Sequence, residues 1–295
     1  MTLSNYDLGL ACYFIGDFGR AAELLRRNVE AANRESGAPR IASQAWLART
    51  LGALGTFAEG RRHGEEALYL ATLDGRGDTP AVAHAGLGLL YLTQGDLESA
   101  IRVLEQGLAL CRASGNRGQL RVIGVDLGYA AALQGRLAEG RTLLEEAISE
   151  SLRTGALAWQ SRLVAWLSEV CRLAGRSEAA WQHARQALDL ARQHKERANE
   201  AHALHQLGVV HADTDPPDVT QAAAHYLQAL ALAEALGMRP LQAHCHRDLG
   251  TLYAATGQRE QACTALSTAI AMYRAMEMTL WLPETEAALA QVEGQ

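Results

Sequence analysis

The sequence lacks the short motifs by which many enzyme families are recognised. It has no glycine-rich phosphate loop ending in Lys-Ser or Lys-Thr, no Cys-x-x-Cys pair, no His-Glu-x-x-His helix and no Gly-x-Ser-x-Gly turn. The segment at 86–91 lacks the third glycine of a dinucleotide-binding turn and falls inside a predicted helix. We therefore expect no catalytic residue, no cofactor and no metal, and we predict that the chain is not an enzyme.

Aromatic residues, prolines and positive charge are also scarce. Aromatic content is 5% and there are 6 prolines, which suits helices packed through small residues. The net charge of −6 argues against a nucleic-acid partner, which requires a concentrated basic surface. No apolar run reaches the ~20 residues of a membrane span, and residues 1–7 lack the pattern of a signal peptide. The 5 widely spaced cysteines fit reduced thiols, so a cytoplasmic location is expected.

What the chain has instead is a repeat of about 40 residues. A glycine that is expected to close a tight turn returns with this spacing. These glycines are Gly16, Gly55, Gly95, Gly135, Gly175 and Gly257. About seven copies of one unit at a constant spacing predict a solenoid, in which each unit packs mainly against its neighbours.

The third copy shows how one unit is built. Leu87, Leu90 and Tyr91 share one face of a predicted helix. Gly95 ends that helix, because glycine adopts left-handed backbone angles without a steric penalty. Asp96 then caps a second helix by accepting hydrogen bonds from its first backbone N–H groups. The predicted fold class is therefore all-α, with helix–turn–helix units joined into an α-solenoid.

We predict one domain over residues 1–295. Its repeats are expected at 4–36, 40–74, 78–114, 117–154, 157–194, 197–236 and 239–276, followed by a capping helix at 280–292 with a polar exposed side. In the second copy, Gly60 and Gly64 lie inside a helix, where glycine is unfavourable relative to alanine, so very close helix contact is expected there. In the sixth copy, residues 213–218 with paired prolines replace the turn glycine. We interpret them as a turn insertion, with a recognition loop as the alternative.

The residues within each unit resemble the tetratricopeptide repeat. That family places an apolar–small pair and a large residue in its first helix, then a small, a large and a small residue along its second. In the third copy these are Leu87-Gly88, Tyr91, Ala100, Leu104 and Gly107, and in the seventh they are Leu249-Gly250, Tyr253, Ala262, Leu266 and Ala269. The resemblance implies a right-handed superhelix. Segments such as 19–28 are also similar to the repeat region at the C-terminus of bacterial multidomain signalling proteins with a nucleotide cyclase or a regulatory ATPase. That implies a regulatory or scaffolding arm and carries over no catalytic residue.

In this family the first helix of each unit lines the concave inner face, which places the candidate partner-binding surface there. The candidates are the residues of those helices that lie outside the packing set. They are Tyr6, Tyr13, Trp46, Arg49, Asp126, Tyr129, Arg162, Trp166, Glu169, His202, His205, Gln206, Arg247 and Asp248. Aromatic residues interspersed with arginines are typical of interaction hot spots. The alternative is that Trp46 and Trp166 bridge neighbouring helices. Family members that hold a peptide's terminal carboxylate present a Lys/Asn clamp on this face, and these positions have neither residue, so chaperone-type activity is not expected.

Histidines on two first helices allow a metal-site hypothesis. His202 and His205 lie one turn apart, and His244 and His246 occupy the equivalent stretch of the next copy. Because structural histidines are the commoner case and no carboxylate partner is evident, we favour packing roles and predict no metal site.

Two functions remain for such a chain. The first is a non-catalytic module that binds a peptide or protein segment in the concave groove, as the regulatory arm of a bacterial signalling protein. The second is a ligand- or peptide-sensing regulatory domain whose superhelix changes shape on binding. The expected partner is a protein or peptide rather than a nucleic acid or a membrane, and association of the chain with itself is left open.

Overall fold

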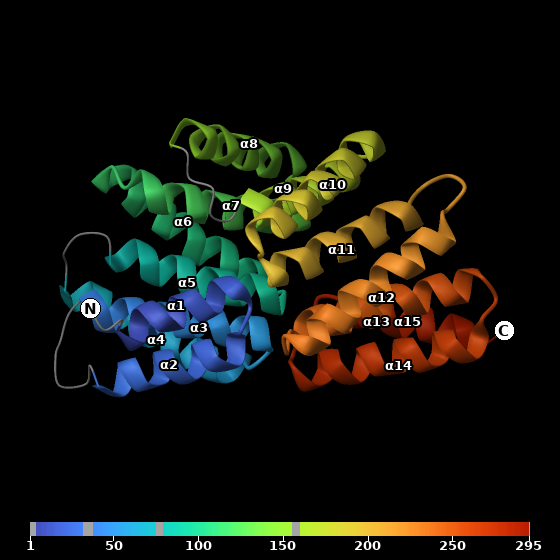
Figure 1. Ribbon diagram of the computed structural model, residues 1–295, viewed down its shortest axis with the longest axis horizontal. Coiled ribbons are helices and arrows are strands. Elements are labelled where there is room, and N and C mark those ends of the chain that lie inside the picture. The colour runs from blue at the N-terminus through green and yellow to red at the C-terminus, as the bar shows by residue number, and fades with distance from the viewer. Residues whose placement is uncertain (1–3, 32–37, 75–78, 155–159, 295) are drawn as a thin grey trace. The chain divides into compact units, whose positions relative to one another are not determined.

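The computed structural model describes residues 4–31, 38–74, 79–154 and 160–294, and the regular elements in those residues are all α-helices (Figure 1). The helices are α1 Asn5–Ile15, α2 Phe18–Ala31, α3 Ala38–Leu54, α4 Phe57–Asp74, α5 Thr79–Gln94, α6 Leu97–Ser114, α7 Arg117–Leu133, α8 Leu137–Thr154, α9 Gln160–Leu173, α10 Ser177–His194, α11 Arg197–Ala212, α12 Val219–Ala235, α13 Arg239–Ala255, α14 Arg259–Ala275 and α15 Leu282–Glu293. The all-α prediction is confirmed.

The chain divides into two compact units. The first, Met1–Leu157, contains α1 to α8 as four hairpins, and the second, Ala158–Gln295, contains α9 to α14 as three hairpins followed by α15. Within each unit, the two helices of a hairpin pack against each other and the second helix also contacts the first helix of the next hairpin. That is the packing expected of helical repeats. Whether the chain behaves as one domain stays a prediction.

Most turns between the helices are closed as the sequence predicted. The six turn glycines all adopt left-handed backbone angles, with φ between 70° at Gly175 and 89° at Gly16. Asp96 accepts a hydrogen bond from the backbone N–H of Ser99 at 3.1 Å, and Asp17 accepts one from Arg20 at 3.1 Å. These local caps end one helix and start the next within two residues, so the two helices must fold back on each other.

The helices of a hairpin meet through a small residue on the first helix and a large residue on the second. A Cβ atom added to Gly88 would lie 2.4 Å from Cδ2 of Leu104, and one added to Gly250 would lie 2.7 Å from Cγ of Leu266. In each of the seven hairpins, the residue just before this small position on the first helix is a leucine, which we call the register leucine. The register leucines are Leu8, Leu47, Leu87, Leu127, Leu167, Leu207 and Leu249.

The close contact expected at the second copy is present. A Cβ atom on Gly60 would lie 2.3 Å from Cδ1 of Leu90, and one on Gly64 would lie 2.7 Å from Cδ1 of Leu87. Both glycines of α4 therefore make room for α5 of the next hairpin. The first helices α3 and α5 are also in close contact, because a Cβ on Gly86 would lie 2.5 Å from the backbone oxygen of Ala45.

Predicted boundaries agree with the helices to within a few residues, and the capping helix begins at Leu282 rather than at 280. Residues 32–36, 78 and 157–159 of the predicted repeats lie outside the described residues. The proline-containing turn joins α11 to α12, and Asp218 caps α12 by accepting a hydrogen bond from Gln221 N–H at 3.0 Å. In the part of the chain that the structure describes, no helix is both long and apolar enough to span a membrane.

Candidate binding face of the first helices

All fourteen predicted site residues lie on first helices of the hairpins. In the first unit Tyr6 and Tyr13 are on α1, Trp46 and Arg49 on α3, and Asp126 and Tyr129 on α7. In the second unit Arg162, Trp166 and Glu169 are on α9, His202, His205 and Gln206 on α11, and Arg247 and Asp248 on α13. The two groups have different surroundings and are described separately.

The second unit joins α9 to α11 through a charged cluster. Glu169 accepts two hydrogen bonds from the guanidinium of Arg172, at 2.7 and 2.8 Å, and one from Nε2 of Gln206 at 2.7 Å. Arg172 also donates to Asp213 at 2.7 Å. Burial by itself raises the pKa of Glu169, but the hydrogen bonds and charge of Arg172 outweigh it and hold that pKa below its usual value. The carboxylate stays ionised at neutral pH.

Arg172 and Asp213 were not among the predicted site residues. Glu169 and Arg172 are one helical turn apart, so their ion pair could have been read from the sequence. Asp213 follows α11, and nothing local in the sequence shows that it reaches Arg172.

A second polar cluster joins α11 to α13. Nε2 of His205 donates to Asp248 at 2.7 Å, and Nε of Arg247 donates to the other carboxylate oxygen at 2.6 Å. Burial alone raises the pKa of Asp248, but Arg247 and His205 lower it well below its usual value. The side chains of His205 and Asp248 keep 14% and 12% of their accessible surface, so the cluster reaches the surface at its edge.

The two remaining histidines of this face are neutral at physiological pH. Nδ1 of His244 is hydrogen-bonded to the hydroxyl of Tyr273 at 2.7 Å, and its ring meets Trp281 edge-on with centroids 4.5 Å apart. Burial, aided by nearby positive charge, lowers the pKa of His244 far below its usual value and that of His202 to about 3. Among the described residues, no group of three His, Cys, Asp or Glu side chains is arranged to hold a metal ion.

The first unit has an aromatic cluster at the start of its inner face. The ring of Tyr13 lies 5.2 Å from Trp46 and 5.3 Å from Phe18, and Phe14 lies 5.8 Å from Trp46, all between centroids. The guanidinium of Arg49 lies 5.3 Å from the Trp46 ring centre. Trp46 therefore bridges α1 and α3, as the alternative interpretation proposed, while part of its surface remains accessible. Phe14 and Phe18 belong to this cluster but were not among the predicted site residues. Phe14 directly follows Tyr13 in the sequence, and Phe18 is the first residue of α2.

Several predicted partner-binding residues are buried. Arg49 and Asp126 form an ion pair at 3.5 Å between α3 and α7, with side chains 4% and 0% exposed. Arg162 is 7% exposed and its guanidinium lies 4.7 Å from the ring centre of Trp166. Arg49, Asp126 and Arg162 therefore stabilise the helices around them, and their role as direct partner contacts stays a prediction. Tyr129 and Trp166 are half-buried and keep accessible surface.

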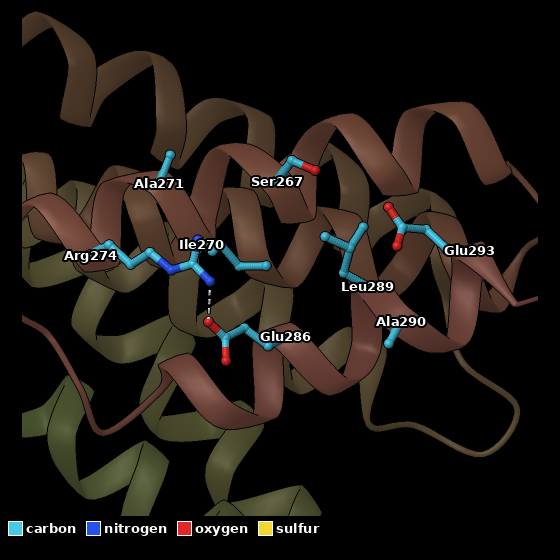
Figure 2. Close-up of a pocket in the computed structure, with 8 residues that line it drawn as sticks. All are labelled: Ser267, Ile270, Ala271, Arg274, Glu286, Leu289, Ala290 and Glu293. Atoms are coloured by element: carbon cyan, nitrogen blue, oxygen red, sulfur yellow. Dashed lines mark hydrogen bonds and ion pairs between the residues drawn. The ribbon is translucent and has the colours of Figure 1, made fainter.

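A groove of about 280 Å³ lies elsewhere, between α14 and α15 (Figure 2). It is lined by Ser267, Ile270, Ala271, Arg274, Glu286, Leu289, Ala290 and Glu293. An ion pair between Arg274 and Glu286, at 2.6 Å, crosses it. None of the predicted site residues lines this groove.

Comparison with known proteins agrees with this geometry. A family model described as tetratricopeptide repeat matches residues 38–113, and a second model of the same description matches residues 123–146 and 243–267. The chain contains tetratricopeptide repeats. The hairpin geometry, the small–large contacts and the first-helix face described above are those of this repeat. No curated protein matches the chain.

Solved structures share the fold of this tetratricopeptide-repeat chain at low sequence identity. A Rap protein complexed with competence and sporulation factor has a TM-score of 0.73 at 12% identity, covering 98% of this chain and 84% of that chain. The Rap conjugation gene regulator of plasmid pLS20, in complex with the Phr* peptide, has a TM-score of 0.71 at 16% identity, covering 93% and 75%. A signal transduction ATPase with numerous domains and a tetratricopeptide repeat sensor, from Pyrococcus horikoshii, has a TM-score of 0.56 at 14% identity, covering 92% and 43%.

Proposed function

We propose that the chain is a non-catalytic module that binds a peptide or protein segment on the inner face of its first helices. The observation that carries this proposal is the pair of polar clusters in the second unit. Glu169 with Gln206, and His205 with Asp248, place hydrogen-bonding side chains from three successive first helices along one face. We call this set, together with Arg247, His244 and Trp166, the inner polar face.

The chemistry of the inner polar face suits a peptide backbone. An extended peptide brings N–H and C=O groups that need partners once water is displaced. Carboxylates such as Asp248 accept from N–H groups, and the Arg247 guanidinium donates to carbonyls. Because each of these side chains is already held by a neighbour, less rotamer entropy is lost when a ligand binds.

Charge does not select the ligand strongly here. The acids of the two clusters, Glu169, Asp213 and Asp248, are each paired with an arginine or histidine, and His202 and His244 are neutral. Affinity would therefore come from hydrogen bonds and from contact with Trp166 and other aromatic rings. This favours an uncharged or mixed-charge peptide over a nucleic acid or a membrane surface.

The structural comparisons support the same class of partner. The pLS20 regulator that shares this fold was solved with its Phr* peptide bound, and the Pyrococcus protein uses its repeats as a sensor. On this basis we propose that the chain acts as the regulatory arm of a bacterial signalling system. A sensing role, with a change of helical stacking on binding, is the second candidate and rests on the same two neighbours.

Selection from a displayed library of random linear peptides of about 12 residues tests the proposal, because such a peptide spans several repeats when extended. Enriched peptides would be synthesised, and their affinity measured by fluorescence polarisation for the wild type and two matched variants. Trp166→Ala removes an aromatic ring of the inner polar face, and this ring lies against the guanidinium of Arg162. Trp181→Ala removes an equivalent ring on the second helix α10, which lies against Arg185 at 5.2 Å.

We expect Trp166→Ala to weaken binding at least about tenfold and Trp181→Ala to leave it within about twofold, as for a hot-spot and a distant residue. Equal loss in both variants, with unchanged helical content, would contradict a role for the inner face. Failure to enrich any peptide would contradict the peptide-binding proposal itself. Small-angle scattering with and without an enriched peptide separates the two candidates, since only the sensing role requires a change in dimensions.

A further inference from the structure

The last described helix, α15, is built like the first helix of a further hairpin. Its pair Leu289-Ala290 follows the pair Leu249-Gly250 of α13 at the repeat spacing of about 40 residues. Val292 of α15 is buried in a cluster with residues of α14, so α15 packs on the second helix before it. α15 therefore has both the register leucine and the small position of the repeat.

The small position of α15 differs from those of the seven hairpins in its exposure. In the hairpins this residue is buried, and it is Gly9, Ala48, Gly88, Gly128, Ser168, Gly208 or Gly250. Wherever it is glycine, a leucine or tyrosine of the hairpin's own second helix lies against it. Ala290 is exposed, and within the described residues no second helix follows α15. The side of α15 that its own second helix would cover is therefore accessible.

This accessible side forms one wall of the groove between α14 and α15 (Figure 2). We call that wall the terminal seat, and its residues are Glu286, Leu289, Ala290 and Glu293. On α13 the equivalent of Ala290 is Gly250, and Leu266 of α14 lies against it. The element that this fold places on such a wall is a helix.

The charge of the terminal seat is specific to α15. Three residues before and four residues after the register leucine, α15 has Glu286 and Glu293. None of the seven hairpins has an acidic residue at either position. They have Asn5, Gln44, His84, Gly124, Val164, Leu204 and His246 before the leucine, and Cys12, Leu51, Tyr91, Ala131, Cys171, His211 and Tyr253 after it. Since Glu293 is exposed, the seat favours a positively charged helix.

The size of Ala290 limits which residue can lie over it. The two hairpins with a larger residue than glycine at the small position have Ala48 and Ser168 there. At the second-helix position where other hairpins have leucine or tyrosine, these two have Gly64 and Ala184. Close packing explains this exchange, because a gain in volume on one helix is offset by a loss on the other. A helix on the terminal seat should accordingly place glycine or alanine over Ala290.

We propose that the terminal seat binds a basic amphipathic helix of a partner protein, with a glycine or alanine over Ala290 and a basic residue directly before it. The second hairpin shows how that basic residue would reach the seat. Gln44, the equivalent of Glu286, is hydrogen-bonded through Oε1 to Nδ1 of His63 at 2.5 Å, and His63 directly precedes Gly64. A lysine or arginine in that place would meet the Glu286 carboxylate. No residue of the terminal seat belongs to the inner polar face.

A synthetic peptide with the sequence of α10, residues 177–194, is a suitable probe. It has Ala184 at the required position, His183 directly before it and no cysteine. His183→Arg gives the basic probe and His183→Glu its acidic control, both held helical by a hydrocarbon staple because a free peptide of this length is only marginally helical. Fluorescence anisotropy with the whole chain as titrant measures binding. We expect the arginine probe to bind at least about tenfold more tightly than the glutamate probe.

Two matched pairs of chain variants locate the bound probe. Ala290→Phe should abolish binding, whereas Ala287→Phe changes an exposed alanine of α15 outside the groove and should leave affinity within about twofold. Glu293→Lys should weaken binding of the arginine probe and strengthen that of the glutamate probe. Glu284→Lys is the same charge change outside the groove and should alter neither beyond about twofold.

The proposal is overturned if neither probe binds below about 1 mM, or if the glutamate probe binds as tightly as the arginine probe. Equal loss of binding in Ala287→Phe and Ala290→Phe, with circular dichroism showing both variants folded, also overturns it. So does competition between the arginine probe and a library-selected peptide, because that would place the probe on the inner polar face. Failure to select any library peptide would contradict the proposed function but not the terminal seat.

Discussion

The hairpins of the two units have the same architecture, but equivalent positions on their first helices hold different types of residue. The positions five and two residues before the register leucine are Ala42 and Ala45, Val82 and Ala85, and Val122 and Val125 on α3, α5 and α7. On α9, α11 and α13 they are Arg162 and Ala165, His202 and His205, and His244 and Arg247. The register leucines and the small positions beside them are similar throughout. The register leucine and the small residue beside it therefore maintain the hairpin. The positions five and two residues before the leucine determine the polarity of the inner face.

The difference has a structural consequence. In the first unit, small inner residues let α3 and α5 approach until the backbone of Ala45 nearly meets Gly86. In the second unit, imidazole and guanidinium groups lie along the helices. His205 is hydrogen-bonded to Asp248, His244 to Tyr273 and Arg172 to Glu169. Buried polar groups need such partners, so a polar inner face has to be built as a network. The first unit gains close packing at this contact, and the second gains a network of hydrogen-bonded polar side chains.

The largest expected effect compares two aspartates that both precede a register leucine. Asp126→Ala should lower the free energy of unfolding by about 3 kcal/mol, because Arg49 would lose a fully buried carboxylate. Asp248→Ala should lower it by about 1–2 kcal/mol, because Arg247 and His205 keep some contact with water. Urea unfolding followed by circular dichroism measures both.

The same pair separates stability from binding. Asp248→Ala should weaken binding of a library-selected peptide, and Asp126→Ala should leave it unchanged at temperatures where the variant is folded. A larger loss of binding in Asp126→Ala than in Asp248→Ala would contradict ligand binding at the inner polar face. A larger loss of stability in Asp248→Ala would contradict the difference in burial between the two ion pairs.

A smaller effect tests close backbone contact in the first unit. Gly140→Ala would place a Cβ 2.5 Å from the backbone oxygen of Gly128, which cannot move without shifting α7, so we expect a loss of about 2 kcal/mol. Gly124→Ala is the matched control, because its Cβ would have no neighbour within 4 Å and alanine favours the helix by up to about 1 kcal/mol. Thermal unfolding of the two variants should shift in opposite directions. A shift in the same direction would contradict the packing described for α7 and α8.

The smallest effect is a pH dependence of stability that comes from His202 in the second unit. The pKa of His202 is lowered to about 3 in the folded chain, whereas an unfolded histidine has a pKa of about 6.5. Between these two values the unfolded state binds a proton at this residue and the folded state does not. The stability contributed by neutral His202 is therefore complete above the unfolded pKa and is lost as pH falls. Between pH 7 and pH 5.5 the loss from this residue should be about 1 kcal/mol.

His202→Gln should reduce the slope of unfolding free energy against pH by that amount over the same interval. An unchanged slope would mean that His202 is hydrated in solution rather than held in a buried, neutral state.

Much of the fold followed from local signals in the sequence. The turn at Gly95 and Asp96 needs only a glycine that accepts left-handed angles and a carboxylate that reaches the next turn, and both effects act within a few residues. The repeat spacing predicted which helices are first helices, and every candidate site residue lies on one. The close contact at Gly60 was also predictable, because glycine inside a helix is unfavourable unless a neighbour requires the space.

The composition of the site depended on which helices meet. Arg172 of α9 reaches Asp213, which follows α11, and Tyr273 of α14 meets His244 of α13. Asp126 of α7 is buried against Arg49 of α3. Each of these contacts joins separate elements of the chain. Helical periodicity shows which face of one helix a residue occupies, but it gives no distance to a side chain on another. Sequence alone therefore determined the repeat, its turns and its first helices. Tertiary packing decided which polar side chains form the inner polar face and which are enclosed, because burial and pairing are properties of several helices together.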